Sequence, residues 1–236
     1  MIMKSYTIHL IRHGITQGNL LGQYIGITDS PLAPEGIKQL QTQSQQAAYP
    51  HAQGYYSSPL SRCVDTLKLL YPDASPTIID DFRECDFGRW EGKSAQDLQN
   101  DADFIEWMQQ GGQMAAPGGE SSAKFIQRTC MAFEKLVESM LRSGQTSAVV
   151  VAHGGTLMAI LSAYGLPRAP FYDWMTDPGC GYSLRITPGF WMRSMVAEVY
   201  ETIPPRPKES QRTPNVIDFA REAAKRAYDP DKQTET

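Results

Sequence analysis

Two histidines, each followed directly by glycine, are the residues best suited to do chemistry in this chain. His13 follows Arg12 at the end of the apolar run Tyr6–Ile11. His153 follows a second apolar run, Ser147–Ala152. If the two runs form neighbouring parallel strands, about 5 Å apart, both imidazoles project from the same carboxyl edge of one sheet. Open α/β sheets bind ligands at that edge, so the pattern indicates an anion site that suits a phosphoryl group.

A further arginine and a run of carboxylates lie where they can join the same edge. Arg62 falls in the first turns of the helix expected after Ser58-Pro59. The segment 80–92 is rich in acidic residues. Breaking a phosphate ester leaves an oxygen that needs a proton, which a carboxyl group of raised pKa can supply. The residues alone leave that proton donor open among Asp80, Asp81, Glu84, Asp86 and Glu91.

The elements that must position these residues alternate between strands and helices. Apolar runs predict strands over 6–11, 55–57, 76–79, 147–152, 182–186 and 195–200. Helical spacing and end signals predict helices over 34–48, 58–70, 94–110, 120–141 and 155–164. This alternation predicts a three-layer α/β fold, in which helices cover both faces of a mainly parallel central sheet.

Short polar signals set several of these boundaries. Ser58-Pro59 predicts a helix start, with the serine as cap and the proline in the first turn. Ser94 and Asp97 fit a capping box at the start of another helix. Pro188-Gly189 predicts the turn of a hairpin between the last two strands.

Composition limits the classes of partner. The chain has 236 residues, of which 41% are hydrophobic and 20% charged, as in soluble globular proteins. Its formal net charge of −4 offers no basic field to nucleic acid or to an anionic membrane. No apolar run approaches the roughly 18 residues that a membrane span needs. We therefore expect a small-molecule partner, no nucleic acid and no membrane.

The ends of the chain and its cysteines indicate organisation and location. Residues 1–203 are expected to form one domain, and 204–236 a polar tail with one short helix near 216–228. Residues 1–5 lack the apolar core of a signal peptide. The four cysteines are scattered and show no CxxC spacing, which indicates reduced thiols and a cytoplasmic protein, with disulfides or a zinc site as the minor alternative.

Several motifs in series resemble those of the histidine phosphatase superfamily, whose fold is phosphoglycerate-mutase-like. They cover about residues 5 to 200 in the family's order, and five motifs in series are far more specific than one Arg-His-Gly tripeptide. The five matching motifs are Arg12-His13-Gly14, 26–32, 57–62, 84–92 and 152–156, and the single residue Asn19 matches as well.

The resemblance implies a role for each matching residue. His13 would be the nucleophile. One nitrogen of the neutral ring would attack phosphorus, and the other would donate a hydrogen bond to a backbone carbonyl. Arg12, Arg62 and His153 would hold the phosphoryl oxygens. Glu84 would be the general acid, and then the base that activates water. Further positions match substrate-binding residues of the family: Thr16, Asn19, Ile25, Gly26 and Gly154. No metal and no cofactor are implied.

The segment 86–92 resembles the phosphatase branch of the family, including alpha-ribazole phosphatases, whereas the cofactor-dependent mutases usually carry His-Tyr-Gly there. We therefore expect a phosphomonoester hydrolase that acts through a phosphohistidine on a small phosphorylated metabolite. A cofactor-dependent phosphoglycerate mutase and a catalytically silent phosphate-binding protein stay open as alternatives. Ile15 stands where the family commonly has Glu, which leaves the substrate open. The oligomeric state is also open, a homodimer included.

Other residues have simpler interpretations. His9, within the first strand, and His51 are expected to be hydrogen-bonded structural residues. Aromatic and methionine side chains at helical spacing are more often core than ligand-facing. For four such residues a substrate-facing wall and a place in the core both stay open: Trp90, Phe104, Trp107 and Met114.

Overall fold

The computed structural model of the chain describes residues 5–46, 49–112 and 114–205. Its strands are β1 (Tyr6–Arg12), β2 (Gly54–Ser57), β3 (Thr77–Ile78), β4 (Ser147–Ala152), β5 (Gly165–Leu166), β6 (Gly181–Ile186) and β7 (Ala197–Ile203). Its α-helices are α1 (Gln17–Leu20), α2 (Pro34–Gln46), α3 (Ser61–Leu70), α4 (Ala102–Gln109), α5 (Ser122–Ser143), α6 (Gly154–Tyr164) and α7 (Pro188–Ser194). Three short 3-10 turns are η1 (Asp80–Phe82), η2 (Gly88–Trp90) and η3 (Phe171–Trp174).

The strands form one seven-stranded sheet in the order β3-β2-β4-β1-β6-β7-β5. β1 pairs in parallel with β4, and β2 in parallel with β3 and β4. β6 is antiparallel to both β1 and β7. Arg12 is in register with Ala152, so His13 and His153 leave neighbouring strands at the same edge. The predicted mainly parallel α/β fold is confirmed.

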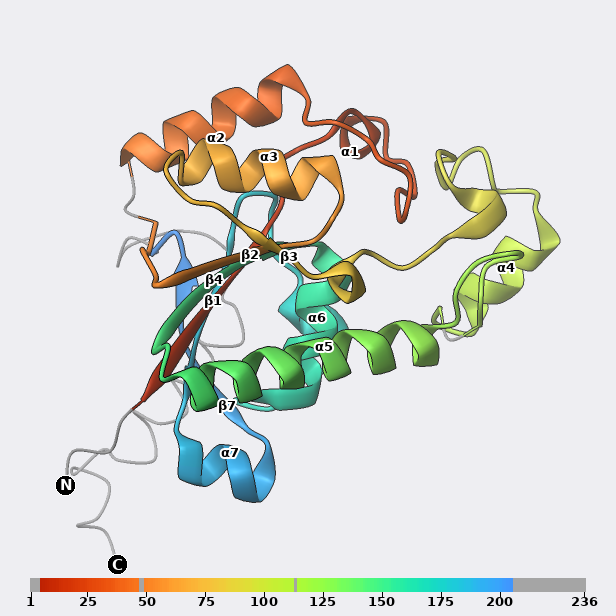
Figure 1. The fold of residues 1–236 in the computed structure, drawn as a ribbon. Coiled ribbons are helices and arrows are strands. Elements are labelled where there is room, and N and C mark those ends of the chain that lie inside the picture. Colours follow the sequence, from red (N-terminus) through yellow and green to blue (C-terminus); the bar gives the residue numbers. More distant parts are fainter. Residues whose placement is uncertain (1–4, 47–48, 113, 206–236) are drawn as a thin grey trace, which may run out of the picture.

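Helices cover both faces of the sheet (Figure 1). The alternation of strand side chains explains why. Ile8, Leu10 and Val150 pack in one buried cluster with residues of α5 and α6. Ile11 and Val151 point the other way, into a second cluster with residues of α2 and α3. The central strands β1 and β4 are therefore largely apolar along their length, as expected where both faces are buried.

A third, smaller apolar cluster lies outside the two main layers. It contains Trp90, Leu98, Phe104 and Ala116, with Trp107 packed against it. Figure 1 shows α4 well away from the sheet, beyond the start of α5. This cluster gives the 87–116 segment its own anchor, and the segment forms one wall of the cavity described below.

Two predicted helix starts are wrong. α3 begins at Ser61, and its capping position, Leu60, makes no side-chain cap. The Ser58 hydroxyl contacts the His153 ring instead. The predicted box at Ser94 and Asp97 does form. However, the chain continues in turns until Asp101, whose carboxylate accepts from the Phe104 amide and caps α4. A cap contributes about 1 kcal/mol, which does not propagate a helix by itself.

The predicted hairpin is correct in pairing and wrong in its connection. β6 and β7 are antiparallel, but the seven-residue helix α7 joins them, with Pro188 at its start and Met195 in a left-handed conformation at its end. β7 therefore begins at Ala197. The tail helix expected near 216–228 lies outside the described residues. Among the described residues, no helix is long and apolar enough to cross a bilayer.

The α5 core contact gives a stability prediction. Phe133 is fully buried between α5 and α6, where it stacks on Tyr164. Phe133→Ala should lower the free energy of unfolding by about 3–5 kcal/mol, because the cavity left behind cannot fully collapse. Met131→Ala, at an exposed position of the same helix, should change it by less than about 0.5 kcal/mol. Urea unfolding followed by circular dichroism measures both, and equal losses would contradict the assignment of the core.

Candidate active site

The two histidines lie side by side at the carboxyl edge of β1 and β4. Their ring centroids are 5.3 Å apart, with the ring planes at 63°. Both side chains are buried. The distance is short enough for both rings to face one tetrahedral anion. The sequence therefore predicted this juxtaposition correctly, from the glycine-flanked ends of two apolar strands.

The His13 ring is fixed by its own backbone. Nδ1 lies 2.7 Å from the Gly14 carbonyl oxygen, which only accepts hydrogen bonds. Nδ1 therefore carries the proton, and Nε2 keeps a free lone pair. The pKa of His13 is lowered to about 3, first by burial and then by the charges of Arg62 and Arg12. The ring is thus neutral near pH 7, as a nitrogen nucleophile requires.

Arg62 and His153 form a buried pair behind His13. Arg62 is 0% exposed, and its Nε donates to His153 Nδ1 at 3.2 Å. His153 Nδ1 is therefore unprotonated, and Nε2 donates to the Ser58 hydroxyl at 2.7 Å. The two guanidinium NH2 groups of Arg62 donate to the Gly26 and Thr28 carbonyls. In this structure both residues have protein partners and neither lines the cavity, so their predicted contacts with a phosphoryl group stay predictions.

Arg12 is placed differently, at the wall of the cavity itself. Its Nη1 donates to the Thr176 carbonyl at 2.7 Å, which orients the guanidinium. Its Nε is buried and has no hydrogen-bond partner among the described residues. A buried donor without a partner costs about 1–3 kcal/mol.

Glu84 lines the same cavity as His13 and Arg12. One carboxylate oxygen accepts from the Cys85 amide and the other from the Gly155 amide, both at 2.9 Å. Burial raises the pKa of Glu84, against the opposing effect of these two amides and of the arginine charges. A Cβ at Gly155 would collide with this carboxylate, so the close contact requires glycine. Of the five carboxylates considered, Glu84 and Asp86 reach the cavity.

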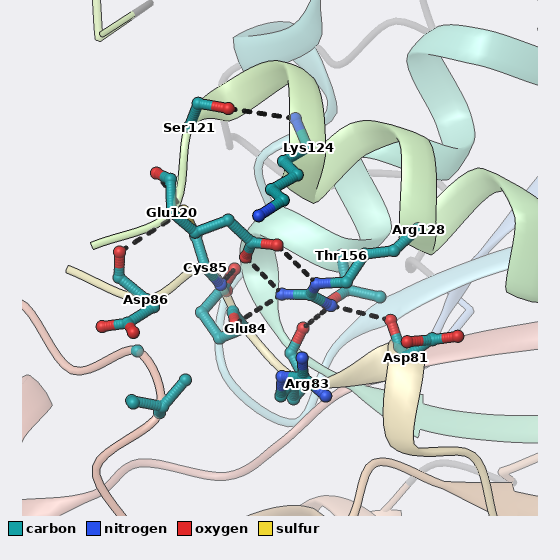
Figure 2. A network of polar contacts seen from close by, with 12 residues as sticks. Asp81, Arg83, Glu84, Cys85, Asp86, Glu120, Ser121, Lys124, Arg128 and Thr156 are labelled. Atoms are coloured by element: carbon teal, nitrogen blue, oxygen red, sulfur yellow. Dashed lines mark hydrogen bonds and ion pairs between the residues drawn. The ribbon is translucent and has the colours of Figure 1, made fainter. Parts of the chain in front are cut away.

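Arg128, which the sequence analysis did not single out, holds the loop that carries Glu84 (Figure 2). Its guanidinium donates to three backbone carbonyls of that loop, those of Asp81, Arg83 and Glu84, at 2.8–2.9 Å. It also forms a bidentate ion pair with Glu120. The two side chains are only 12% and 14% exposed. α5 thus fixes the backbone from which Glu84 projects.

The five predicted substrate-binding positions divide into three groups. Asn19, Ile25 and Gly154 line the cavity. Thr16 is buried and forms a capping box with Asn19 at the start of α1, so it shapes the loop. The Gly26 amide is held by Glu91, and its carbonyl accepts from Arg62.

The cavity has a volume of about 610 Å³ and extends from His13 to the segment anchored by α4. Of the four aromatic and methionine residues left open above, Trp107 and Met114 line it, whereas Trp90 and Phe104 are buried in the small cluster. His9 is structural as expected, since its ring is hydrogen-bonded to Ser183. Among the described residues, no group of three or more His, Cys, Asp or Glu side chains is arranged to hold a metal ion.

Sequence reasoning missed the partners of the site. Ser58 was interpreted as a cap, although the same Ser-Ser-Pro stretch belongs to the matching motif. Thr66 accepts a hydrogen bond from the Gly14 amide at 2.9 Å, next to the nucleophile, and no local signal indicated it. Arg128 lies on an amphipathic helix, where an arginine is usually solvated.

Comparison with known proteins agrees with this geometry. Residues 8–198 match the model of the histidine phosphatase superfamily (branch 1). The adenosylcobalamin/alpha-ribazole phosphatase of Escherichia coli is 30% identical over 186 residues, covering 77% of this chain and 90% of that protein. A 2,3-bisphosphoglycerate-dependent phosphoglycerate mutase of Rhizobium etli is 27% identical over 179 residues, covering 71% of this chain and 83% of that protein.

A solved structure extends the likeness to the fold. The crystal structure of the alpha-ribazole phosphatase of Shigella flexneri superposes with a TM-score of 0.69 at 27% identity, over 82% of this chain and 94% of that one. The motifs, the paired histidines and the family match lead to one conclusion. The chain belongs to the histidine phosphatase superfamily.

Proposed function

We propose that this protein hydrolyses phosphomonoesters of small metabolites through a phosphohistidine on His13, without a metal ion. The observation that carries the proposal is the hydrogen bond from His13 Nδ1 to the Gly14 carbonyl. It leaves Nε2 unprotonated beside Arg12 and Glu84, which line the same cavity. A nucleophile, a cation and a carboxyl group of raised pKa are the parts that this reaction needs.

In the first step, His13 Nε2 attacks phosphorus and the ester P–O bond breaks. Glu84, whose pKa is raised by burial, transfers a proton to the departing oxygen, so an alcohol leaves. The phosphoryl group stays on His13. Proton transfer of this kind typically accelerates a reaction by about 10²–10⁴-fold.

In the second step, Glu84 is ionised and accepts a proton from water. The water oxygen attacks phosphorus, the N–P bond breaks, and inorganic phosphate is released. The bond pair returns to His13 Nε2, and Glu84 holds its proton again. Both residues are then ready for a second turnover, with no oxidant, reductant or metal consumed.

Arginines and His153 would stabilise the charge on the phosphoryl oxygens. Arg12 lines the cavity and supplies a permanent positive charge there. Arg62 contributes a fixed positive charge behind His13. His153 carries a proton on Nε2, which now donates to Ser58 and would donate to a phosphoryl oxygen instead when substrate binds. A single preorganised donor of this kind is worth about 3 kcal/mol.

We place the protein with the phosphatases rather than the mutases because of the segment 86–92, where Asp-Phe-Gly-Arg-Trp-Glu-Gly replaces the usual His-Tyr-Gly. A silent phosphate-binding protein would have no use for Glu84, whose buried carboxyl faces the nucleophile's cavity. Cys63, Cys85 and Cys130 are free thiols, which supports a reducing compartment such as the cytoplasm. We extend the proposal to a small phosphorylated substrate, with no nucleic acid, membrane or metal partner.

A panel of substrates with and without EDTA tests the activity. Phosphate release from simple monoesters should be unchanged by EDTA, because no step passes through a metal ion. Little interconversion of 2- and 3-phosphoglycerate should occur. Loss of activity in EDTA that Mg²⁺ or Zn²⁺ restores would overturn metal independence. Mutase turnover above hydrolysis would favour the mutase alternative.

His13→Ala should abolish both turnover and phosphoenzyme formation, because the alanine side chain has no nucleophile. Labelled substrate, rapid quenching at alkaline pH and mass spectrometry detect the phosphoenzyme. His51→Ala, at an exposed histidine outside the cavity, is the matched control and should keep wild-type activity. An active His13→Ala protein would show that another residue is the nucleophile.

Arg128→Lys should reduce kcat/KM for an alkyl phosphate by about tenfold or more, because lysine keeps the charge beside Glu120 but cannot donate to three carbonyls. For p-nitrophenyl phosphate, whose leaving group needs little protonation, the loss should be much smaller. Glu84→Gln should show the same contrast. Arg142→Lys, at an exposed arginine of the same helix, is the control. Equal losses on both esters would reduce Arg128 to a purely structural residue.

A further inference from the structure

We infer that the natural substrate is a phosphate ester of a bulky, apolar or aromatic alcohol that carries no carboxylate. This inference rests on the proposed phosphatase function and concerns the part of the cavity beyond the phosphoryl group. The observations are the side chains that form the cavity walls and the charges that these walls present.

One wall of the cavity is aromatic. Tyr24 and Trp107 meet edge to face, with ring centroids 6.0 Å apart, and both line the cavity. The Trp107 Nε1 donates to the Met114 carbonyl at 3.0 Å, so the indole's donor is already used. Its ring therefore offers the cavity an apolar surface, not a hydrogen bond.

The rim continues this apolar surface. Met114, Tyr172 and Met175 line the cavity and are all more than a third exposed to solvent. Large side chains of this kind are costly to leave in water. Their convergence on one opening is typical of a site that receives an apolar group. Deeper in the same cavity lie Phe125 and Met158, which are buried.

The charges in the cavity disfavour a leaving group that carries a carboxylate. Arg12 is the one cation among the described lining residues, and it would already be paired with the phosphoryl group. Apart from Glu84, which holds a proton in the proposed first step, the acidic residues that line the cavity are Asp86 and Glu120. A carboxylate on the substrate, as in a phosphorylated hydroxy acid or amino acid, would meet repulsion and no free counter-charge.

The acidic side chains are themselves committed elsewhere. Glu120 is paired with Arg128, and Asp86 accepts from the Gly88 amide at 2.7 Å. They are therefore poorly placed to bind an ammonium group strongly. The cavity of about 610 Å³ has room for a group much larger than a three-carbon acid.

Three esters of primary alcohols test this inference: 2-phenylethyl phosphate, phosphoserine and 3-phosphoglycerate. We expect kcat/KM for the aromatic ester to exceed that of each carboxylate by at least tenfold, although its alcohol is the poorer leaving group. A preference for either carboxylate, with phosphate still released, would overturn the substrate class and leave the phosphatase function intact. Absence of turnover and of phosphoenzyme with all three would overturn both.

A charge introduced at the rim gives an independent test. Met175 is next to Thr176, whose carbonyl accepts from Arg12, so Met175→Lys places a cation near the phosphoryl site. It should raise kcat/KM for 3-phosphoglycerate and lower it for 2-phenylethyl phosphate, shifting their ratio by at least tenfold. Met192→Lys, at an exposed methionine of α7 outside the cavity, is the matched control. An unchanged ratio with Met175→Lys would contradict the inference.

Discussion

The site depends on the parallel register of β1 and β4. Pairing Arg12 with Ala152 brings the next residue of each strand to the same edge, and both are histidines. A slip of one residue would turn the apolar side chains of a strand to the opposite face. The two clusters on the two faces of the sheet therefore hold this register, and the stability of the core is also what positions the catalytic edge.

Desolvation dominates the electrostatics at that edge. Burial lowers the pKa of both histidines and raises that of Glu84, so all three favour their neutral forms. Two arginines remain as fixed charges, because guanidinium groups stay protonated in proteins. Positive charge without protonated imidazole is suited to a dianionic phosphoryl group, since it attracts the anion and leaves the nucleophilic lone pair free.

The sequence was most informative where chemistry and periodicity coincide. His13 and His153 end apolar strands, so their meeting followed from strand pairing alone. Only the family resemblance distinguished Glu84 from the neighbouring acidic residues. Which of these carboxylates faces the cavity depends on a loop that Arg128 holds from α5.

Ser58 was assigned to a cap because Ser-Pro is a strong local signal. The capping box at Ser94 formed without a helix, because a cap does not propagate a helix by itself. Trp107 lines the cavity whereas Trp90 lies in the small apolar cluster. This difference depends on tertiary packing, which the spacing of residues in the sequence does not encode.

The central claim is that phosphate leaves in two displacements, through an enzyme-bound phosphoryl group on His13. The most direct measurement uses a phosphate ester made chiral at phosphorus with oxygen isotopes and follows the transfer of its phosphoryl group to an acceptor alcohol. Two in-line displacements predict retention of configuration. Inversion would mean a single direct attack by the acceptor and would contradict the account.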